Sequence, residues 1–246
     1  MAVLDKALDV LEALAERPSQ NVAELSQAAG VTKATAYRIL ATLETRGCVV
    51  TYGRVRRYSI GQAFQLYSRA AREADRLVPL AQPHMRELAQ FGETVNLGAL
   101  ANQKLLYLEV IESSQSLRAI SEVGSFDTLH ATALGKAILS RMPADERDAI
   151  LAEAELVPLT DRTVTAVAAL RQQIERACTD GYAIDDEENE IGMRCVAAPI
   201  VNADGWPVAA LSVSGPSSRM TASAIDSIIA GTISTARRIS EELLRI

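Results

Sequence analysis

The segment Asn21–Val50 carries residue types whose spacing suits contact with DNA. It predicts a helix, a tight turn at Gly30, a second helix and a strand. Small residues on the outward side of the second helix would let its backbone approach base edges, and its basic residues could bond to guanine or phosphate. The outward set is Thr32, Lys33, Ala34, Thr35, Tyr37 and Arg38. The alternative is an ordinary three-helix unit whose third helix is simply solvated.

A β-hairpin is predicted directly after these helices, with strands at Val49–Tyr52 and Arg56–Ile60 and a turn at Gly53-Arg54. Its three arginines, Arg54, Arg56 and Arg57, could reach the minor groove or flanking phosphates, as the wing of a winged helix does. Arginines on a hairpin can also merely keep a sheet edge soluble.

A second group of polar residues falls inside otherwise apolar strands nearer the C-terminus. Ser212 and Ser214 alternate, so both point to the same face of their strand, while Cys195 and Asp185 lie in or at the end of neighbouring strands. Small polar groups on one sheet face could line a pocket for a compact polar ligand. The bland alternative is a buried cysteine that acts as a small hydrophobe and serines that satisfy themselves locally.

No catalytic constellation assembles from this sequence, and no cofactor is expected. There are two histidines, His84 and His130, and neither GxSxG nor HExxH occurs. The acidic run Asp185–Glu190 lacks calcium-loop spacing and is better explained as a solvated loop. Three widely spaced cysteines argue against disulfides and a zinc site. With no apolar run of about 18 residues and no basic N-terminal region of a signal peptide, a cytoplasmic protein without a membrane partner is expected.

Local signals predict how the first group is positioned. Asn21 and Glu24 form a capping box for the second helix, Gly30 makes the turn with positive φ, and Thr32 caps the third helix. Apolar spacing predicts an amphipathic first helix and an inward face of the third. These two faces are Leu4, Ala7, Leu8, Leu11 and Leu14, and Ala36, Ile39, Leu40 and Leu43.

Charge is distributed unevenly along the 246 residues, whose formal net charge is −6. Residues 31–60 hold six basic residues against one glutamate, a local net of +5. Residues 76–246 hold 15 basic and 23 acidic residues, a net of −8. A small basic face on an acidic body suits a regulator that must not coat DNA indiscriminately.

The remaining pattern predicts an α+β protein in three segments, namely a DNA-binding domain over 1–61, a linker helix over 62–78 and a ligand-binding domain over 79–246. The last would hold an antiparallel sheet flanked by helices. Strands are expected at residues 93–111 as a hairpin turning at Asn102-Gln103, at Ser116–Gly124, and in a C-terminal hairpin that turns at Asp204-Gly205. Helices are expected near 131–141, 143–153, 163–180 and 221–244.

The chain resembles the IclR family of bacterial transcription regulators. Glu24-Leu25, Gly30, Lys33-Ala34-Thr35, Arg38 and Leu43-Glu44 follow the family's N-terminal run, although Ser26 and Ala34 depart from it. The runs Leu129–Leu139, Gly181–Ile200 and Ala209–Arg219 resemble the family's effector-domain motifs. The resemblance implies a winged helix-turn-helix and a GAF-like α/β sensor of small carboxylates or aromatic acids. It implies an effector site made by Ala133, Leu134, Asp185, Cys195, Ser212 and Ser214, with Ser116 and Ala119 as walls and His130 and Thr132 as further candidates.

The expected function is therefore a ligand-responsive repressor that binds a palindromic double-stranded DNA operator, as a homodimer or a dimer of dimers. Two rivals remain open at this point. One is an enzyme with Cys195 as its nucleophile, although no histidine lies in a motif that would activate it. The other is an architectural DNA-binding protein whose C-terminal domain is purely structural.

Overall fold

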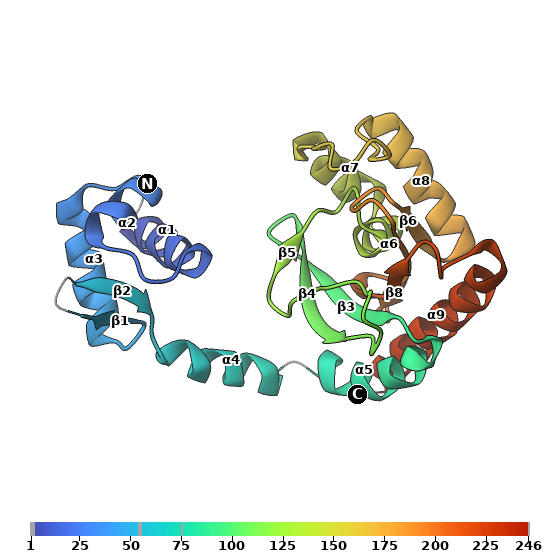
Figure 1. Ribbon diagram of the computed structural model, residues 1–246, viewed down its shortest axis with the longest axis horizontal. Coiled ribbons are helices and arrows are strands. Elements are labelled where there is room, and N and C mark those ends of the chain that lie inside the picture. Colours follow the sequence, from blue (N-terminus) through green and yellow to red (C-terminus); the bar gives the residue numbers. More distant parts are fainter. Residues whose placement is uncertain (1–2, 54–55, 75, 246) are drawn as a thin grey trace. The chain divides into compact units, whose positions relative to one another are not determined.

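The computed structural model describes residues 3–53, 56–74 and 76–245 of the chain. The chain divides into two compact units, residues 1–75 and 76–246 (Figure 1). The expected linker segment over 62–78 remains a prediction: its helix, α4 (Ala63–Ala74), groups with the first unit, and the next helix begins at Leu77.

The first unit is a helix-turn-helix followed by a two-stranded hairpin. Its elements are α1 (Val3–Glu16), α2 (Val22–Ala28), α3 (Lys33–Thr45), β1 (Val49–Tyr52), β2 (Arg57–Ile60) and α4. The capping box is present, because Asn21 Oδ1 accepts from the amides of Ala23 and Glu24 while Glu24 Oε2 accepts from the Asn21 amide. Gly30 has φ +61°, which allows the sharp turn that an L side chain would strain.

The apolar face of α1 differs from the expectation. Val10, Ala13 and Leu14 are buried against α2 and α3, whereas Leu4 and Leu8 are 70% and 50% exposed. The core of this small unit needs only the C-terminal turns of α1, so the apolar stripe continues beyond the helices that could cover it.

The second unit is a three-layer α+β fold. Its elements are α5 (Leu77–Leu88), a short 3₁₀ turn η1 (Ala89–Phe91), β3 (Thr94–Ala101), β4 (Lys104–Ile111), β5 (Phe126–Asp127), α6 (Ala133–Arg141), α7 (Ala144–Glu153), α8 (Val167–Asp180), β6 (Ala183–Asp186), β7 (Met193–Val201), β8 (Pro207–Pro216) and α9 (Ala222–Leu243). The strands form one antiparallel sheet in the order β5-β4-β3-β8-β7-β6.

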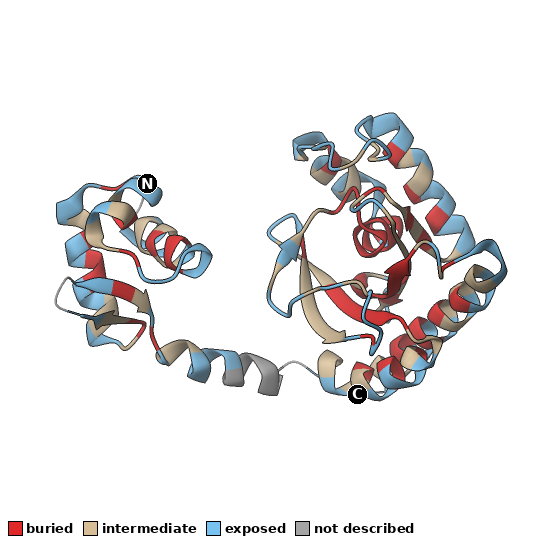
Figure 2. Cartoon of the chain, in the orientation of Figure 1, coloured by how far each residue is buried: buried red, intermediate tan, exposed pale blue. Residues whose placement is uncertain are grey.

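Both faces of this sheet are covered, and each has its own core. Helices α5 and α9 pack on one face through residues such as Met85 and Ile239, against Val95, Leu211 and Val213. Helices α6 and α8 cover the other face. Figure 2 shows that α6 and the central strands are the most buried part of this unit. Side chains on the α6 face of the central strands are therefore shielded from water.

One predicted strand was wrong. Residues 116–124 form an irregular loop, and the edge strand β5 comes only afterwards, at Phe126–Asp127. The β-prone residues Leu117, Ile120 and Val123 stay more than half exposed, so they gain no packing that would favour a strand. The expected helix over 163–180 begins only at Val167, whereas the helices predicted near 131–141, 143–153 and 221–244 lie within two residues of their expected ends.

Candidate functional site

The first candidate site is the outward face of α3. Thr32, Lys33, Ala34 and Arg38 are exposed, Thr35 is half-buried, and Tyr37 is 50% exposed. On the opposite side, Ala36, Ile39 and Leu40 are buried in the core of the unit. The helix therefore presents its small and basic residues on a face that its own packing holds rigid.

The first turn of α3 is already organised by hydrogen bonds. Thr32 Oγ1 accepts from the Thr35 amide at 3.2 Å, and the two threonine hydroxyls lie 2.9 Å apart. Ser26, where the family pattern has alanine, donates its hydroxyl to the Val31 carbonyl across the turn at 2.6 Å. The hydroxyls near this turn thus fix its geometry first, which leaves Lys33 and Arg38 as the side chains free to reach a partner.

The arginines of the hairpin are not equivalent. The Arg56 side chain is 66% exposed and only loosely paired with Glu44, at 3.8 Å. Arg57 folds back onto the body of the unit, where it donates to the Ser19 carbonyl and lies 3.5 Å from Glu24 Oε2. Arg54 lies outside the described residues. Arg57 was a predicted DNA contact, but in this structure it ties the hairpin to the turn before α2.

Gln20 is a structural residue that the sequence did not reveal. Its backbone exchanges two hydrogen bonds with Tyr58 of β2, and its side chain donates to the carbonyls of Ala13 and Arg17. It is 2% exposed. It therefore joins the end of α1 to the hairpin and fixes the hairpin against α1.

The second candidate site lies on the α6 face of the six-stranded sheet. Register pairing sets Asp185, Cys195 and Ser214 side by side on β6, β7 and β8. Asn96 on β3 lies opposite Ser212, and its side-chain nitrogen donates to Ser212 Oγ at 3.2 Å and to Ser214 Oγ at 3.1 Å. Four of the residues expected from sequence are thus neighbours in space, joined by an asparagine that sequence reasoning missed.

The electrostatics of this row favour neutral forms. Burial raises the pKa of Asp185 to about 6, against the opposing pull of amide hydrogen bonds from Glu188 and Asn189 and of the charge on Lys136. Loss of solvation and the neighbouring Asp185 carboxylate raise the pKa of the Cys195 thiol. A thiol held in its neutral form is a poor nucleophile, so the row is suited to binding rather than to covalent chemistry.

A buried ion pair holds the acidic turn after β6 against α6. Lys136 Nζ lies 2.6 Å from Glu188 Oε1 and donates to Gln173 Oε1 at 3.2 Å. Lys136 is 1% exposed and Glu188 5%. The expectation of a simply solvated loop over 185–190 is therefore wrong for Asp185 and Glu188, which are both buried. Lys136 offsets the cost of removing the Glu188 carboxylate from water.

The first turn of α6 needs a glycine and a threonine. Thr132 Oγ1 accepts from the Gly135 amide at 3.1 Å and donates to the Thr128 carbonyl at 2.6 Å. A Cβ on Gly135 would stand 2.3 Å from the Leu129 carbonyl oxygen, so only glycine permits this approach. Ala133 and Leu134 are buried, and the amides of a first helical turn lack intrahelical partners. Thr132 acts here through the helix, with its hydroxyl already used.

The expected wall residues lie on the loop between β4 and β5. Ser116 is exposed, whereas the Ala119 carbonyl accepts from Thr94 Oγ1 at 2.9 Å. Arg219 bonds to Glu93 and donates to the Leu117 carbonyl at 2.8 Å. These tethers hold the loop beside the start of β3, so Ala119 is fixed there while Ser116 faces solvent.

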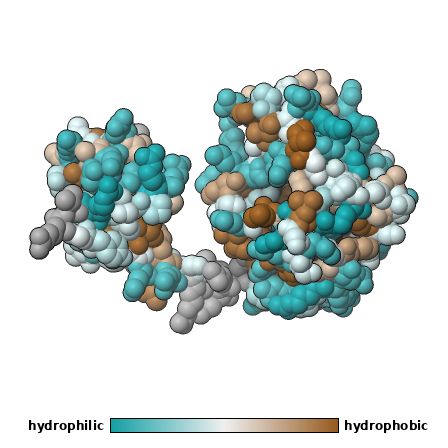
Figure 3. Space-filling view, in the orientation of Figure 1, coloured by the Kyte–Doolittle hydropathy of each residue, from teal (hydrophilic) through white to brown (hydrophobic). Residues whose placement is uncertain are grey.

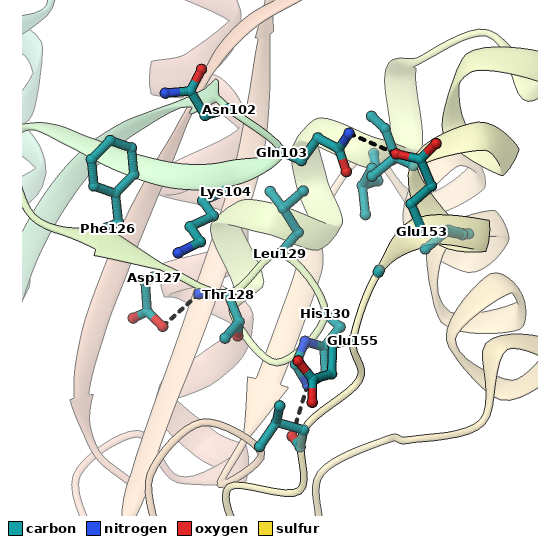
Figure 4. Close-up of a pocket in the computed structure, with 15 residues that line it drawn as sticks. Asn102, Gln103, Lys104, Phe126, Asp127, Thr128, Leu129, His130, Glu153 and Glu155 are labelled. Carbon is teal, nitrogen blue, oxygen red and sulfur yellow. Dashed lines mark hydrogen bonds between the residues drawn. The ribbon is translucent and has the colours of Figure 1, made fainter. Parts of the chain in front are cut away.

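His130 does not join the row on the sheet. It is buried, and its Nε2 lies 3.0 Å from the Val157 carbonyl oxygen. It lines a separate hollow of about 790 Å³ between the β4–β5 end of the sheet and α7, beside Lys104, Asp127 and Glu155 (Figure 4). No other residue of the expected effector set lines this hollow.

Two negative findings concern the described part of the chain alone. Over residues 3–53, 56–74 and 76–245, no three His, Cys, Asp or Glu side chains come together in a way that could hold a metal ion. Within the same ranges no helix is long and apolar enough to cross a membrane.

Comparisons with known proteins match the chain from end to end. Residues 3–52 match the family model described as the IclR helix-turn-helix domain, and residues 69–241 match the one described as bacterial transcriptional regulator IclR C-terminal. The chain is 35% identical over 240 residues to the HTH-type transcriptional regulator KdgR of Escherichia coli K12, a match that covers 97% of this chain and 91% of that protein. It is 29% identical to the transcriptional repressor IclR of the same strain, over 96% of this chain and 88% of the repressor.

A solved structure with a bound ligand is also similar. It is an IclR homologue from Microbacterium hydrocarbonoxydans in complex with 4-hydroxybenzoate. The two chains align with a TM-score of 0.83 and 25% identity, over 98% of this chain and 99% of that one. The likeness extends through both units.

Proposed function

The chain belongs to the IclR family of transcription regulators, and from that premise we propose that it is a repressor whose hold on a palindromic operator changes when a small organic acid binds its C-terminal unit. As a member of this family it is a DNA-binding regulator and not an enzyme. The observation that carries the proposal is that one unit presents an exposed basic helix face and the other unit holds a buried polar row.

In the DNA-binding part, α3 enters the major groove. Lys33 and Arg38 are exposed at the outward face and supply base or phosphate contacts, and Ala34 allows close approach of the backbone. Thr32, Thr35 and Tyr37 flank these contacts. Arg56 extends the interface from the hairpin, and Arg54, outside the described residues, is proposed for the same role.

In the effector-binding part, a small acid binds on the α6 face of the sheet. Ser212 and Ser214 supply hydroxyls, and the first-turn amides of α6 at Ala133 and Leu134 suit a carboxylate. Asp185 and Cys195 line the same face. An aromatic acid is one class to test, since a relative binds 4-hydroxybenzoate; the position of His130 in another hollow argues against a direct part in this site.

Two copies would read the two halves of a palindrome, because a twofold operator calls for a twofold protein. Exposed apolar side chains support self-association of the first unit, namely Val3, Leu4 and Leu8 on α1 and Leu66 and Tyr67 on α4. The second unit also shows apolar patches on the face seen in Figure 3, which suits pairing of dimers into a tetramer. Such a protein acts on DNA in the cytoplasm.

The paired DNA-binding units can be spaced either correctly or incorrectly for the operator. The effector alters DNA binding only if these two arrangements of the dimer differ in affinity for the effector. Helix α4 connects the two units, so a change in the second unit can reach the first through it. An effector that binds more tightly to the arrangement with incorrectly spaced DNA-binding units would cause the protein to release the operator.

Footprinting upstream of the gene and its neighbours, with and without a panel of small carboxylates, tests the proposal. We expect a protected palindrome of two half-sites and at least one acid that changes protection. If the protein protects DNA, but no acid changes the protection or raises the melting temperature, it would instead be an architectural protein. Failure to protect any DNA would contradict the proposal outright.

A further inference from the structure

Asn96 stands at the β3 end of the polar row in the proposed effector site. It is the third residue of β3, which pairs with β8 on one side and with β4 on the other, and it is 2% exposed. A buried asparagine in a central strand must give up water for its whole amide group, so each of its polar atoms needs a partner.

The amide nitrogen has its partners. It donates to Ser212 Oγ and to Ser214 Oγ, at 3.2 Å and 3.1 Å, and so uses both of its N–H groups. Each serine hydroxyl accepts from Asn96, and one of the two hydroxyls also donates to the other, which leaves one hydroxyl proton to donate elsewhere. The two hydroxyls lie 3.3 Å apart.

The amide oxygen has no partner. Asn96 Oδ1 is buried and makes no hydrogen bond within the described part of the chain. Turning the amide round would not remove the deficit, since two buried N–H donors would then lack acceptors in place of one oxygen lacking a donor. Buried polar atoms without partners are rare in folded proteins, and each one calls for an explanation.

The groups around Asn96 indicate which ligand would supply a hydrogen-bond donor to its side-chain oxygen. Asp185, in the same row, is a second acceptor when ionised, while one serine hydroxyl and the first-turn amides of α6 are donors. A carboxylate satisfies the donors but leaves the Asn96 oxygen unpaired. A ligand that also carries a hydroxyl can donate to that oxygen.

We propose that Asn96 is a specificity-determining residue, whose side-chain oxygen selects hydroxyl-bearing organic acids over the corresponding acids that lack the hydroxyl. This inference rests on the proposed function, in which the same face binds the effector. A site with a buried group waiting for a hydroxyl discriminates strongly against the deoxy analogue, because that analogue leaves the group unpaired.

The test uses matched pairs of acids on the full-length protein: lactate and propionate, 3-hydroxybutyrate and butyrate, 4-hydroxybenzoate and benzoate. Ligand-observed NMR titration gives a dissociation constant for each. For at least one pair, wild-type protein should bind the hydroxy acid at least about tenfold more tightly than its partner.

Two substitutions separate selection from scaffolding. Asn96→Leu keeps the approximate shape but removes the acceptor, so the preference within that pair should fall to within about twofold. Asn96→Asp keeps an acceptor oxygen, so the preference should persist although both acids bind more weakly beside a new negative charge. Thr232→Val, which removes a buried hydroxyl on α9 at the other face of the sheet, controls for loss of stability and should leave the preference unchanged.

The outcomes distinguish this inference from the function beneath it. Acids that bind wild-type protein without preference in any pair overturn the role of Asn96 and leave acid sensing intact. A preference that survives Asn96→Leu, or one that Asn96→Asp abolishes, also overturns it. If no acid of either kind binds wild-type protein, both this inference and the acid-sensing part of the proposed function fail, whereas protection of the operator would still stand.

Discussion

The two candidate sites differ in how they handle polar groups. The face of α3 keeps Lys33 and Arg38 in water on one short stretch of chain, and its packing lies entirely behind them. The α6 face of the sheet draws Asn96, Asp185, Cys195 and Ser214 from separate strands and removes most of their surface from water. A site for a large charged partner can remain solvated, whereas a site for a small ligand must be desolvated to discriminate.

The largest effect on this difference between the two sites is expected from a substitution that disturbs the packing of α6 over the buried site. Gly135→Ala would place a methyl group 2.3 Å from the Leu129 carbonyl oxygen, which is backbone and cannot move aside. We expect a loss of about 3 kcal/mol or more in the free energy of unfolding. Thermal melting of the full chain measures it.

Gly124→Ala is the matched control for that change. Gly124 has φ +88°, but nothing stands within 4 Å of the Cβ position. The strain alone should cost about 1 kcal/mol. Equal melting temperatures for the two variants would mean that the close approach of α6 to Leu129 is unimportant.

The second prediction concerns the buried acid. The folded-state pKa of Asp185 is raised from 3.8 to about 6, so the folded protein holds a proton that the unfolded chain has already released. Stability must therefore fall as pH rises from about 4 to about 6 and then level off. Asp185→Asn lacks this loss and keeps the acceptor for the Glu188 amide, so above pH 6 it should be more stable than wild type by up to about 3 kcal/mol.

Melting temperatures of wild type and variant across pH 4.5–8 provide the measurement. The gap between the two curves should widen with rising pH up to about 6. Asp204→Asn, at an exposed turn, should run parallel to wild type. Parallel curves for Asp185→Asn as well would show that Asp185 is ionised in the folded protein at low pH.

The third prediction separates two arginines of the DNA-binding unit. Arg38→Ala should weaken operator binding by roughly 1–3 kcal/mol if the side chain contacts a base, with little effect on melting. Arg57→Ala should lower the melting temperature with little effect on operator affinity, because Arg57 is bonded to Ser19 and lies near Glu24. Fluorescence anisotropy with the footprinted operator, alongside thermal melting, measures both. A loss of affinity in Arg57→Ala without loss of stability would restore it to the interface.

The smallest expected effect concerns the hairpin. Each phosphate contact contributes about −0.9 to the slope of log affinity against log salt. Arg56→Gln should flatten that slope by about one, and Arg54→Gln is expected to do the same. A slope that stays the same in Arg56→Gln would mean that Arg56 makes no phosphate contact.

Much of the first site could be predicted because its signals are local. The Asn21–Glu24 capping box, the turn at Gly30 and the Thr32 cap each involve residues within a few positions of one another, and all three were confirmed. The α+β class was predicted as well, from alternating patterns and family motifs. Arg57 was the exception, since its partners lie 38 and 33 residues away and no local pattern reveals them.

The second site could be predicted only as a list of residue types. Ser212 and Ser214 share a face because strand residues alternate, which the sequence alone determines. Only the strand order sets Asn96 against those serines, more than 100 residues distant, and only the packing of α6 buries Lys136 beside Glu188 and sends His130 into a different hollow. The physical reason is desolvation: the sequence determines which groups can form hydrogen bonds, and the tertiary structure decides which of them lose water and must find a partner.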